Sequence, residues 1–324
     1  MNYRKLGMSG IKVSEISLGC WTMGGPSRRE GYATGYADVN EDDIREAILY
    51  ALENGVNHFD NADCYGDGKA ERMLAKILGK KSKDVIISSK VGHFKGTAEN
   101  AYEPSHIRHQ CEQSLINLKR EYIDIYYFHH GNFGKNDKYL DDAINAMNNL
   151  KKEGKIRIIG LSAYSSSDFE RLLPKIKPDV LQSWAHIMDD KFITEGSIVR
   201  NLLEKNNLSF VAFSPLNQGL LLDKFKPGNP PIFEEGDHRK DKPKFSKEAL
   251  EKLAPKMEKL KERFGSETKE LARIALQYVL YHQVVGCVIP GFRNKNQVDI
   301  NLSAQGKELS EEDIKYIKHV FNNL

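Results

Sequence analysis

Four ionisable side chains, a carboxylate, a phenol, an ammonium and an imidazole, stand in or just after stretches that are typical of β-strands. Asp60, Lys90 and His129 each end a short apolar run, and Tyr65 lies five residues after the first of them. Runs of this kind predict buried strands. If the strands lie parallel in one sheet, their carboxyl ends share one edge and the four groups meet there. Such a set can transfer a proton.

Strand-like and helix-like stretches alternate along the whole chain. We expect strands at residues 16–18, 58–60, 85–90, 123–129, 156–161, 180–182, 209–213 and 287–289. We expect helices near residues 40–55, 71–78, 105–119, 140–153, 167–173, 195–206, 246–264, 268–282 and 310–321, with a further one beginning near residue 294. Strand–helix alternation with apolar, β-branched strands predicts a parallel sheet that is buried on both faces.

Eight strand–helix units predict an α/β fold with a single closed (β/α)8 barrel, the TIM barrel. The rival is an open doubly wound sheet, but no GxGxxG follows the first strand. We expect one domain over residues 1–324, with a long loop at about residues 220–245. Because this loop follows the seventh strand, it would lie on the active-site face, as a lid or as a solvated insertion.

Charge and composition exclude several classes of protein. Lys and Arg total 48 against 45 Asp and Glu, which leaves a net charge of +3 and does not indicate binding to nucleic acid or membranes. No apolar run approaches the roughly 20 residues of a membrane span, and the first residues form no apolar signal core. The four cysteines form no CxxC pair, which favours reduced thiols in a cytoplasmic protein.

The segment around Asp60 and Tyr65 resembles the aldo-keto reductase family. Residues 59–71 read FDNADCYGDGKAE, where that family typically has F-D-T-A-x-x-Y-G-x-G-x-S-E. Further matches follow in order: SSKVG at 88–92, DIYYFH at 124–129, GLS at 160–162, AFSPLNQG at 212–219 and VIPG at 288–291. Each motif is weak alone, but six in order are specific. Residues 236–239, GDHR, resemble the bacterial-type subgroup near the potassium-channel β-subunits.

The resemblance implies a catalytic tetrad of the four residues named first. Carbonyl reduction needs a hydride at carbon, which a nicotinamide cofactor carries, and a proton at oxygen. Tyr65 would donate the proton. Lys90, held by Asp60, would lower the phenol's pKa from about 10, and His129 would orient the carbonyl. His130 should point away, because successive strand side chains face opposite ways, and we expect it at the rim with a local hydrogen bond.

The resemblance also implies a cofactor site at the strand ends. Ser162 and Gln182 would bind the nicotinamide carboxamide, Phe213 would stack on the ring, and Arg293 would pair with a 2′-phosphate or remain a solvated surface charge. We therefore expect NADP(H) rather than NAD(H), and no metal. The expected cofactor-binding residues are Trp21, Ser162, Gln182, Phe213, Ser214, Pro215, Leu216, Gln218, Gly219, Lys224, Arg239, Gly291, Arg293, Gln297 and Asn301.

Several functions stay open at this point. The first is NADP(H)-dependent reduction of aldehydes or ketones, or oxidation of sugars or alcohols. The second is a cofactor-binding regulatory subunit with slow or no turnover. A Schiff-base aldolase at Lys90 is a third, and a metal-dependent hydrolase is disfavoured because Asp60 and His129 are too few ligands. The family's usual Asn and Tyr are here Ala163 and Phe213, so the substrate cannot be carried over.

Overall fold

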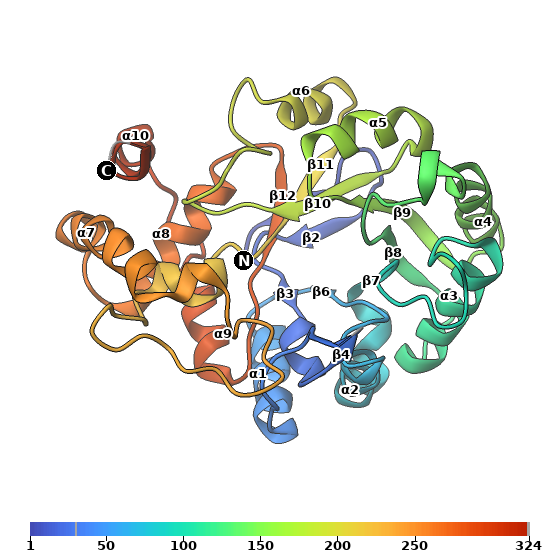
Figure 1. The fold of residues 1–324 in the computed structure, drawn as a ribbon, viewed down its shortest axis with the longest axis horizontal. Coiled ribbons are helices and arrows are strands. Elements are labelled where there is room, and N and C mark those ends of the chain that lie inside the picture. The colour runs from blue at the N-terminus through green and yellow to red at the C-terminus, as the bar shows by residue number, and fades with distance from the viewer. Residues whose placement is uncertain (30, 323–324) are drawn as a thin grey trace.

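A parallel sheet of eight strands organises the computed structural model, which describes residues 1–29 and 31–322. The strands run in the spatial order β12-β11-β10-β9-β8-β7-β6-β3. Two parallel bridges, Ile16 to Val288 and Gly19 to Gly291, join the two outer strands. The sheet is therefore a nearly closed barrel (Figure 1). Its strands are β3 (Leu18–Gly19), β6 (His58–Asp60), β7 (Ile86–Val91), β8 (Ile123–Phe128), β9 (Ile156–Ser162), β10 (Val180–Trp184), β11 (Ser209–Phe213) and β12 (Val285–Ile289).

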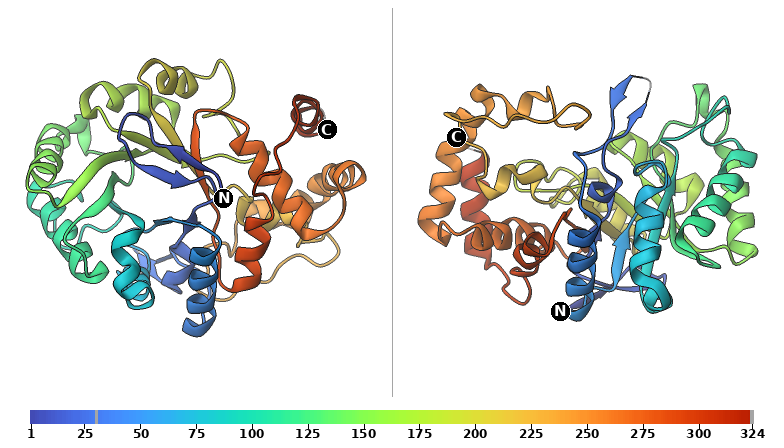
Figure 2. Two further views of the ribbon diagram at one scale, coloured as in Figure 1. Left: turned by 180° about the vertical axis from the view of Figure 1, so that it is seen from behind. Right: turned by 90° about the horizontal axis from the view of Figure 1, so that it is seen from below.

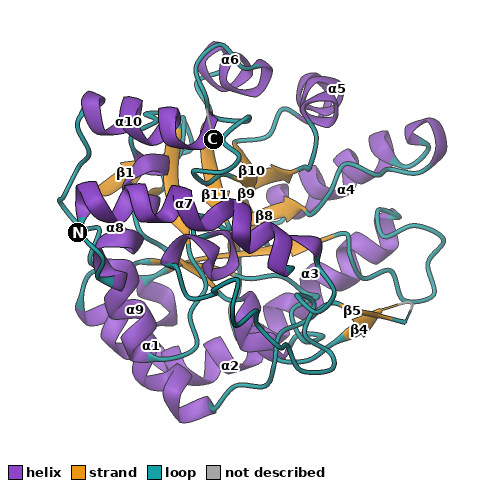
Figure 3. Ribbon diagram, turned by 60° about the vertical axis from the view of Figure 1, so that its left-hand side comes forward, coloured by secondary structure: helices purple, strands orange, loops and turns teal. Residues whose placement is uncertain are grey.

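Helices surround the sheet on its outer side (Figure 3). The α-helices are α1 (Glu41–Glu53), α2 (Lys69–Leu78), α3 (Pro104–Leu118), α4 (Leu140–Lys152), α5 (Ser166–Ile176), α6 (Ile198–Lys205), α7 (Lys247–Phe264), α8 (Thr268–Leu280), α9 (Lys295–Leu302) and α10 (Glu311–Asn322). Short 3-10 helices are η1 (Trp21–Gly24), η2 (Gly79–Asp84), η3 (Lys135–Asp137), η4 (Asn217–Leu222) and η5 (Pro243–Phe245). None of the described helices is long and apolar enough to cross a membrane.

Local sequence explains where several helices begin. The side chain of Asn40 accepts hydrogen bonds from the backbone N–H groups of Asp42 and Asp43, and three acidic residues occupy the first turn of α1. This arrangement satisfies free backbone donors and complements the helix dipole. Ser246 and Asn294 cap α7 and α9 in the same way. The (β/α)8 prediction is confirmed, with element ends shifted by a few residues.

Two hairpins lie outside the predicted pattern. The first, β1 (Tyr3–Lys5) with β2 (Lys12–Ser14), is antiparallel and lies across one end of the barrel (Figure 2, left). The second, β4 (Arg28–Arg29) with β5 (Tyr32–Ala33), projects from the body of the chain (Figure 2, right). Neither has the apolar, β-branched run on which strand prediction depends, so neither hairpin was predicted.

The barrel interior has its own apolar cluster, separate from the main core between sheet and helices. Leu6 and Val13 of the first hairpin pack there, both fully buried, against residues of the strands. Tyr127 of β8 fills the space beside Gly160, where a Cβ atom would lie only 2.2 Å from its ring. The hairpin thus closes the amino-terminal end of the strands with packed side chains, which leaves the carboxyl-terminal end for a pocket.

Candidate active site

Lys90 is at the centre of the candidate active site and is fully buried. Its Nζ donates to Asp60 Oδ2 at 2.5 Å and to the carbonyl of Asn61 at 2.6 Å. It also donates to the Tyr65 hydroxyl at 3.3 Å. The ammonium therefore links the carboxylate and the phenol, as the strand ends predicted. A charge buried this completely is tolerated because it is paired and hydrogen-bonded.

Asp60 is fixed by more than the lysine. Its Oδ1 accepts hydrogen bonds from Ser88 Oγ at 2.7 Å and from Gln182 Nε2 at 3.0 Å. Asp60 is 2% exposed, so these contacts hold its carboxylate in one orientation. Gln182, expected to bind the cofactor's carboxamide, thus has its amide nitrogen on Asp60 in this structure.

The phenol of Tyr65 has a raised rather than a lowered pKa. Burial of the ring lifts the pKa well above 10, and the negative charge of Asp60 lifts it further. The net lowering of this pKa that was expected from Lys90 is not found in this structure, because burial of the ring is the largest influence on the phenol. The phenol is consequently protonated throughout the physiological pH range and can act as an acid.

His129 enters the pocket and His130 does not. His129 follows β8, and the centroid of its imidazole ring lies 6.0 Å from the centroid of the Tyr65 ring. Burial holds its pKa well below the usual value, so the ring is neutral. His130 instead bonds the carbonyl of Gly92 through Nε2 at 2.8 Å and accepts from the backbone of Asn132 through Nδ1. The two neighbours face opposite ways, as strand geometry requires.

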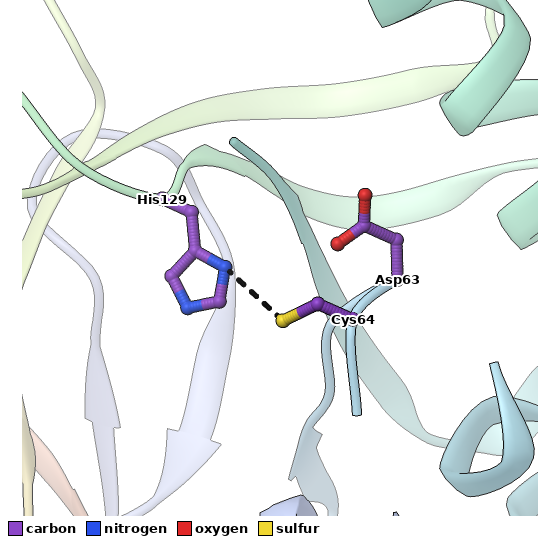
Figure 4. A group of neighbouring side chains, drawn as sticks. All are labelled: Asp63, Cys64 and His129. Atoms are coloured by element: carbon purple, nitrogen blue, oxygen red, sulfur yellow. Dashed lines mark hydrogen bonds between the residues drawn. The ribbon is translucent and has the colours of Figure 1, made fainter. Parts of the chain in front are cut away.

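The thiol of Cys64 contacts the other side of His129. Its Sγ lies 3.8 Å from Nδ1 (Figure 4). Burial and the neighbouring Asp63 raise the pKa of this thiol to about 12, so it keeps its proton. A thiol that donates to Nδ1 leaves the remaining imidazole proton on Nε2. The pair thus favours the tautomer whose Nε2 is a hydrogen-bond donor.

A large cavity opens beside these residues at the carboxyl ends of the strands. Its volume is about 1090 Å³, at the upper end of the range for small-molecule sites. Asp60, Tyr65 and His129 line it, whereas Lys90 lies behind its wall. The expected cofactor residues that line it are Trp21, Gln182, Phe213, Ser214, Pro215, Leu216, Gln218, Gly219, Lys224, Arg239, Gly291, Arg293, Gln297 and Asn301.

Ser162 is the one expected cofactor residue outside the lining. It ends β9, is 1% exposed, and its Oγ has no hydrogen-bond partner among the described residues. A buried hydroxyl without a partner costs free energy. A polar ligand group that reached this hydroxyl would remove that cost. The residues present therefore fit a carboxamide at the strand ends.

The loop after β11 supplies cations to one side of the cavity. Lys224 and Lys242 line it, and burial lowers the pKa of both ammonium groups. The Lys244 pKa falls to about 8 for the same reason, and its Nζ donates to Asn217. Arg239 differs, because its guanidinium is bound at two points by Asp237, at 2.7 and 3.0 Å. Arg239, an expected cofactor-binding residue, could therefore bind a cofactor phosphate only in competition with the Asp237 carboxylate.

Arg293 lies at the opening of α9, with its charge held by carbonyl oxygens. Its guanidinium donates to the carbonyls of Ala37 and Asp38, and its backbone N–H donates to Gln297 Oε1 at 2.9 Å. No acidic side chain among the described residues forms an ion pair with it. Asn301, one turn beyond Gln297, donates to the carbonyl of Gly291 at 3.2 Å. The positive charge thus remains available to an anion.

Several pocket residues were missed by the sequence reasoning. The second hairpin brings Arg29 and Tyr32 to the cavity, and the loop after β7 brings His93 and Phe94. His238 lies 4.3 Å from the Trp21 ring, donates through Nδ1 to a carbonyl and bonds the side chain of expected cofactor residue Gln218 through Nε2. These residues come from segments without strand or helix pattern, where only tertiary contacts set position.

Comparison with known proteins gives the family. The Aldo/keto reductase family matches residues 15–322, so the chain belongs to this family. It is an oxidoreductase enzyme by that membership. The L-galactose dehydrogenase of Arabidopsis thaliana is 28% identical over 308 residues, which cover 93% of this chain and 87% of that protein.

Solved structures of bacterial proteins show the same architecture. The glycerol dehydrogenase AKR11B4 from Gluconobacter oxydans superposes with a TM-score of 0.80 at 25% identity, covering 98% of this chain and 94% of that one. The holo form of aldo-keto reductase AKR11C1 from Bacillus halodurans gives 0.76 at 26% identity, covering 99% and 96%. The predicted family and barrel are both confirmed.

Proposed function

We propose that this chain is an NADP(H)-dependent oxidoreductase that reduces aldehydes and ketones, or oxidises sugars and alcohols in reverse. The observation that carries this proposal is the position of Lys90 Nζ, 2.5 Å from Asp60 and 3.3 Å from the Tyr65 hydroxyl at the wall of a large cavity. A protonated phenol beside a fixed cation is suited to give up its proton only when negative charge develops on a substrate oxygen.

Each group of the site has a separate task. The Tyr65 hydroxyl donates its proton to the carbonyl oxygen, and the Lys90 ammonium stabilises the phenolate that forms. Asp60 keeps Lys90 charged and in place. His129 donates from Nε2 to the same carbonyl oxygen and sets its angle, in the tautomer that the Cys64 contact at Nδ1 favours. A nicotinamide cofactor, when bound, would supply the hydride.

The residues that would hold the cofactor follow the cavity from β9 to α9. Ser162 Oγ, buried without a partner, would form a hydrogen bond with the nicotinamide carboxamide. The Phe213 ring would stack on the nicotinamide face. Lys224 and Lys242 would neutralise the pyrophosphate. Arg293, whose guanidinium donates to the carbonyl oxygens of Ala37 and Asp38, would bind a 2′-phosphate, which is the reason to favour NADP(H) over NAD(H).

The substrate class is supported by the names of relatives. These include the plant L-galactose dehydrogenase, the bacterial glycerol dehydrogenase and an L-glyceraldehyde 3-phosphate reductase from Escherichia coli, 26% identical over 321 residues. Their substrates share a carbonyl or alcohol next to further hydroxyl-bearing carbons. We infer that small aldoses, hydroxyaldehydes and polyols are the first compounds to test.

Two further proposals concern the whole chain. We propose that it forms one domain, because the main core includes residues from Ile16 to Ile317. A single cooperative unfolding transition would support this, and two separate transitions would contradict it. We also propose a cytoplasmic location, because all four cysteines are buried and unpaired, as reducing compartments favour.

Turnover assays test the function directly. Purified protein is given NADPH or NADH with a panel of short aldehydes and aldoses, and NADP⁺ with the matching alcohols and polyols. We expect steady oxidation of NADPH with at least one carbonyl compound, at a higher kcat/KM than with NADH. Tight binding of NADPH without turnover of any panel member would contradict the proposed reaction.

A further inference from the structure

A second group of side chains, Asp63, Cys64 and His129, adjoins the tetrad and shares His129 with it (Figure 4). Each residue offers one ligand atom: a carboxylate oxygen, a thiol sulfur and an imidazole nitrogen. These atoms all lie within 4.8 Å of one another, and all three residues are buried. The proposed reaction uses only the opposite edge of the His129 ring and makes no use of the Asp63 carboxylate.

Asp63 is the unusual member of this group. It is only 8% exposed, yet no side chain among the described residues forms a hydrogen bond with either of its carboxylate oxygens. Figure 4 shows one of these oxygens on the side of the thiol and the imidazole. A buried carboxyl group without partners costs free energy in proportion to its lost hydration. A cation between the three ligand atoms would remove that cost.

The distance between sulfur and nitrogen fits a tetrahedral metal. Bonds of about 2.3 Å to sulfur and about 2.0 Å to nitrogen place the two ligand atoms roughly 3.6 Å apart around zinc. The observed separation between Cys64 Sγ and His129 Nδ1 is 3.8 Å. Only the carboxylate would have to move inward. Cys64 and His129 both line the cavity, so an ion has a route from solvent.

We propose that Asp63, Cys64 and His129 form a binding site for a zinc-class divalent cation, with a fourth position open to water. Binding replaces the thiol proton of Cys64 and any proton on the Asp63 carboxyl group, and both protons leave to solvent. The carboxylate and thiolate then together balance the charge of the ion. Imidazole and thiolate ligands select zinc-class metals over magnesium and calcium. This inference does not depend on the proposed reaction, because it concerns Nδ1 of His129 and not Nε2.

Among the described residues, Arg29 and Lys90 are the cations that act on Asp63, and both have anionic partners. Lys90 donates to Asp60, and Arg29 forms an ion pair with Asp67 at 3.0 Å. Arg29 also donates to the carbonyl of Cys64 at 2.9 Å, which fixes the backbone of the ligand loop. Each of these cations is therefore already paired with a carboxylate before a metal ion arrives.

The barrel contains a matched control for this proposal. Cys287 Sγ lies 3.7 Å from His58 Nδ1, almost the same separation as in the proposed site. His58 Nε2 is 3.1 Å from Ser88 Oγ, and both residues of the pair are fully buried. Neither lines the cavity. This second thiol–imidazole pair has the same two ligand types without a third ligand or an entry path.

Cobalt titration of the untagged, full-length protein tests the site. We expect one equivalent of Co²⁺ to produce a thiolate-to-cobalt absorption band in the wild type, and added Zn²⁺ to remove it. The band should be lost in Cys64→Ser and retained in Cys287→Ser. Asp63→Asn should weaken Co²⁺ binding by about tenfold or more, since it removes a charged ligand.

Two results would overturn the proposal: no band in the wild type, or a band that survives in Cys64→Ser. A second measurement covers the case in which a variant does not fold. Wild-type crystals soaked in Zn²⁺ should show anomalous density between Cys64 Sγ, His129 Nδ1 and the Asp63 carboxylate. Anomalous density only at other positions would rule the site out.

Discussion

The two ends of the barrel are built in opposite ways. At the amino ends of the strands, Leu6 and Val13 seal the interior with apolar side chains. At the carboxyl ends, Lys90 and Asp60 are buried together beside a cavity of about 1090 Å³. Burial of apolar surface at the first end stabilises the fold. The second holds charges whose burial is unfavourable unless every partner is present.

This contrast indicates that stability and reactivity are separated along the barrel axis. Substitutions at the sealed end should change the free energy of unfolding and leave turnover per folded molecule unchanged. Substitutions at the open end should mainly change turnover. Lys90 is the expected exception, since the same ion pair both completes a buried network and assists the chemistry.

Lys90→Met should have the largest effect. It should lower both stability and turnover, unlike the other substitutions at either end of the barrel. It leaves Asp60 buried without its counterion, which costs about 3–5 kcal/mol of stability, and it removes the cation that stabilises the phenolate, lowering kcat by roughly 10³-fold. Chemical denaturation and NADPH oxidation measure the two effects. A variant that keeps wild-type turnover would show that Lys90 has only a structural role.

Leu6→Ala should lower the free energy of unfolding by about 2–4 kcal/mol, because a fully buried side chain leaves a cavity. Turnover per folded molecule should not change. The matched control is Met8→Ala in the same hairpin, where the side chain is 85% exposed, with an effect within about 0.5 kcal/mol. Equal losses in both variants would mean that the hairpin does not seal the barrel.

His129→Ala should lower kcat by roughly 10²-fold, because the carbonyl oxygen loses a donor. His130→Ala should retain most of kcat, because its imidazole bonds the carbonyl of Gly92 and the backbone of Asn132, outside the pocket. Steady-state kinetics on both variants measure this difference. Similar losses from the two substitutions would refute the assignment.

Arg293→Ala should weaken NADPH binding by about tenfold and leave NADH binding unchanged, since only NADPH carries the 2′-phosphate. Lys295→Ala is the control, because that lysine pairs with Glu46 on the surface. Fluorescence titration with each cofactor gives both affinities. Equal affinity for the two cofactors, unchanged in the variant, would contradict the role of Arg293.

The smallest expected effect is on the pH profile. Burial raises the pKa of Tyr65 and lowers that of His129, so the donor stays protonated and the imidazole neutral over a wide range. A proton donor loses activity as pH rises through its pKa, and a raised pKa moves that loss upward. The kcat for reduction should therefore be flat from about pH 6 to about pH 9. A decline centred near neutrality would contradict the raised pKa.

Regular elements were predictable because local physics determines them. The strand expected at residues 85–90 is β7, Ile86–Val91, and the helix expected from residue 40 is α1, which begins at Glu41 with Asn40 as its cap. The strand ends predicted that Asp60, Lys90 and His129 would meet, because parallel strands bring their carboxyl ends to one edge, whereas the role of Tyr65 rested on the family resemblance. Because each of Asp60, Lys90 and His129 ends a strand-like run, their positions in the sequence predicted that their side chains would lie close together.

The remaining features depend on contacts between distant segments. The hairpin strands β4 and β5 are held by neighbours such as Trp21, whose Nε1 donates to the carbonyl of Thr34 at 3.0 Å. Asp237 neutralises Arg239, although nothing in the order of residues says that their side chains meet. The raised pKa of Tyr65 follows from burial, which only the folded chain determines.

The most direct test of the central claim, that Tyr65 protonates the substrate, is single-turnover reduction by wild type and Tyr65→Phe. The change removes only the hydroxyl, so NADPH affinity and the melting temperature should stay near wild-type values. The account predicts a rate of NADPH oxidation lower by about 10³-fold or more. A Tyr65→Phe rate within a few-fold of wild type, with NADPH bound normally, would contradict it.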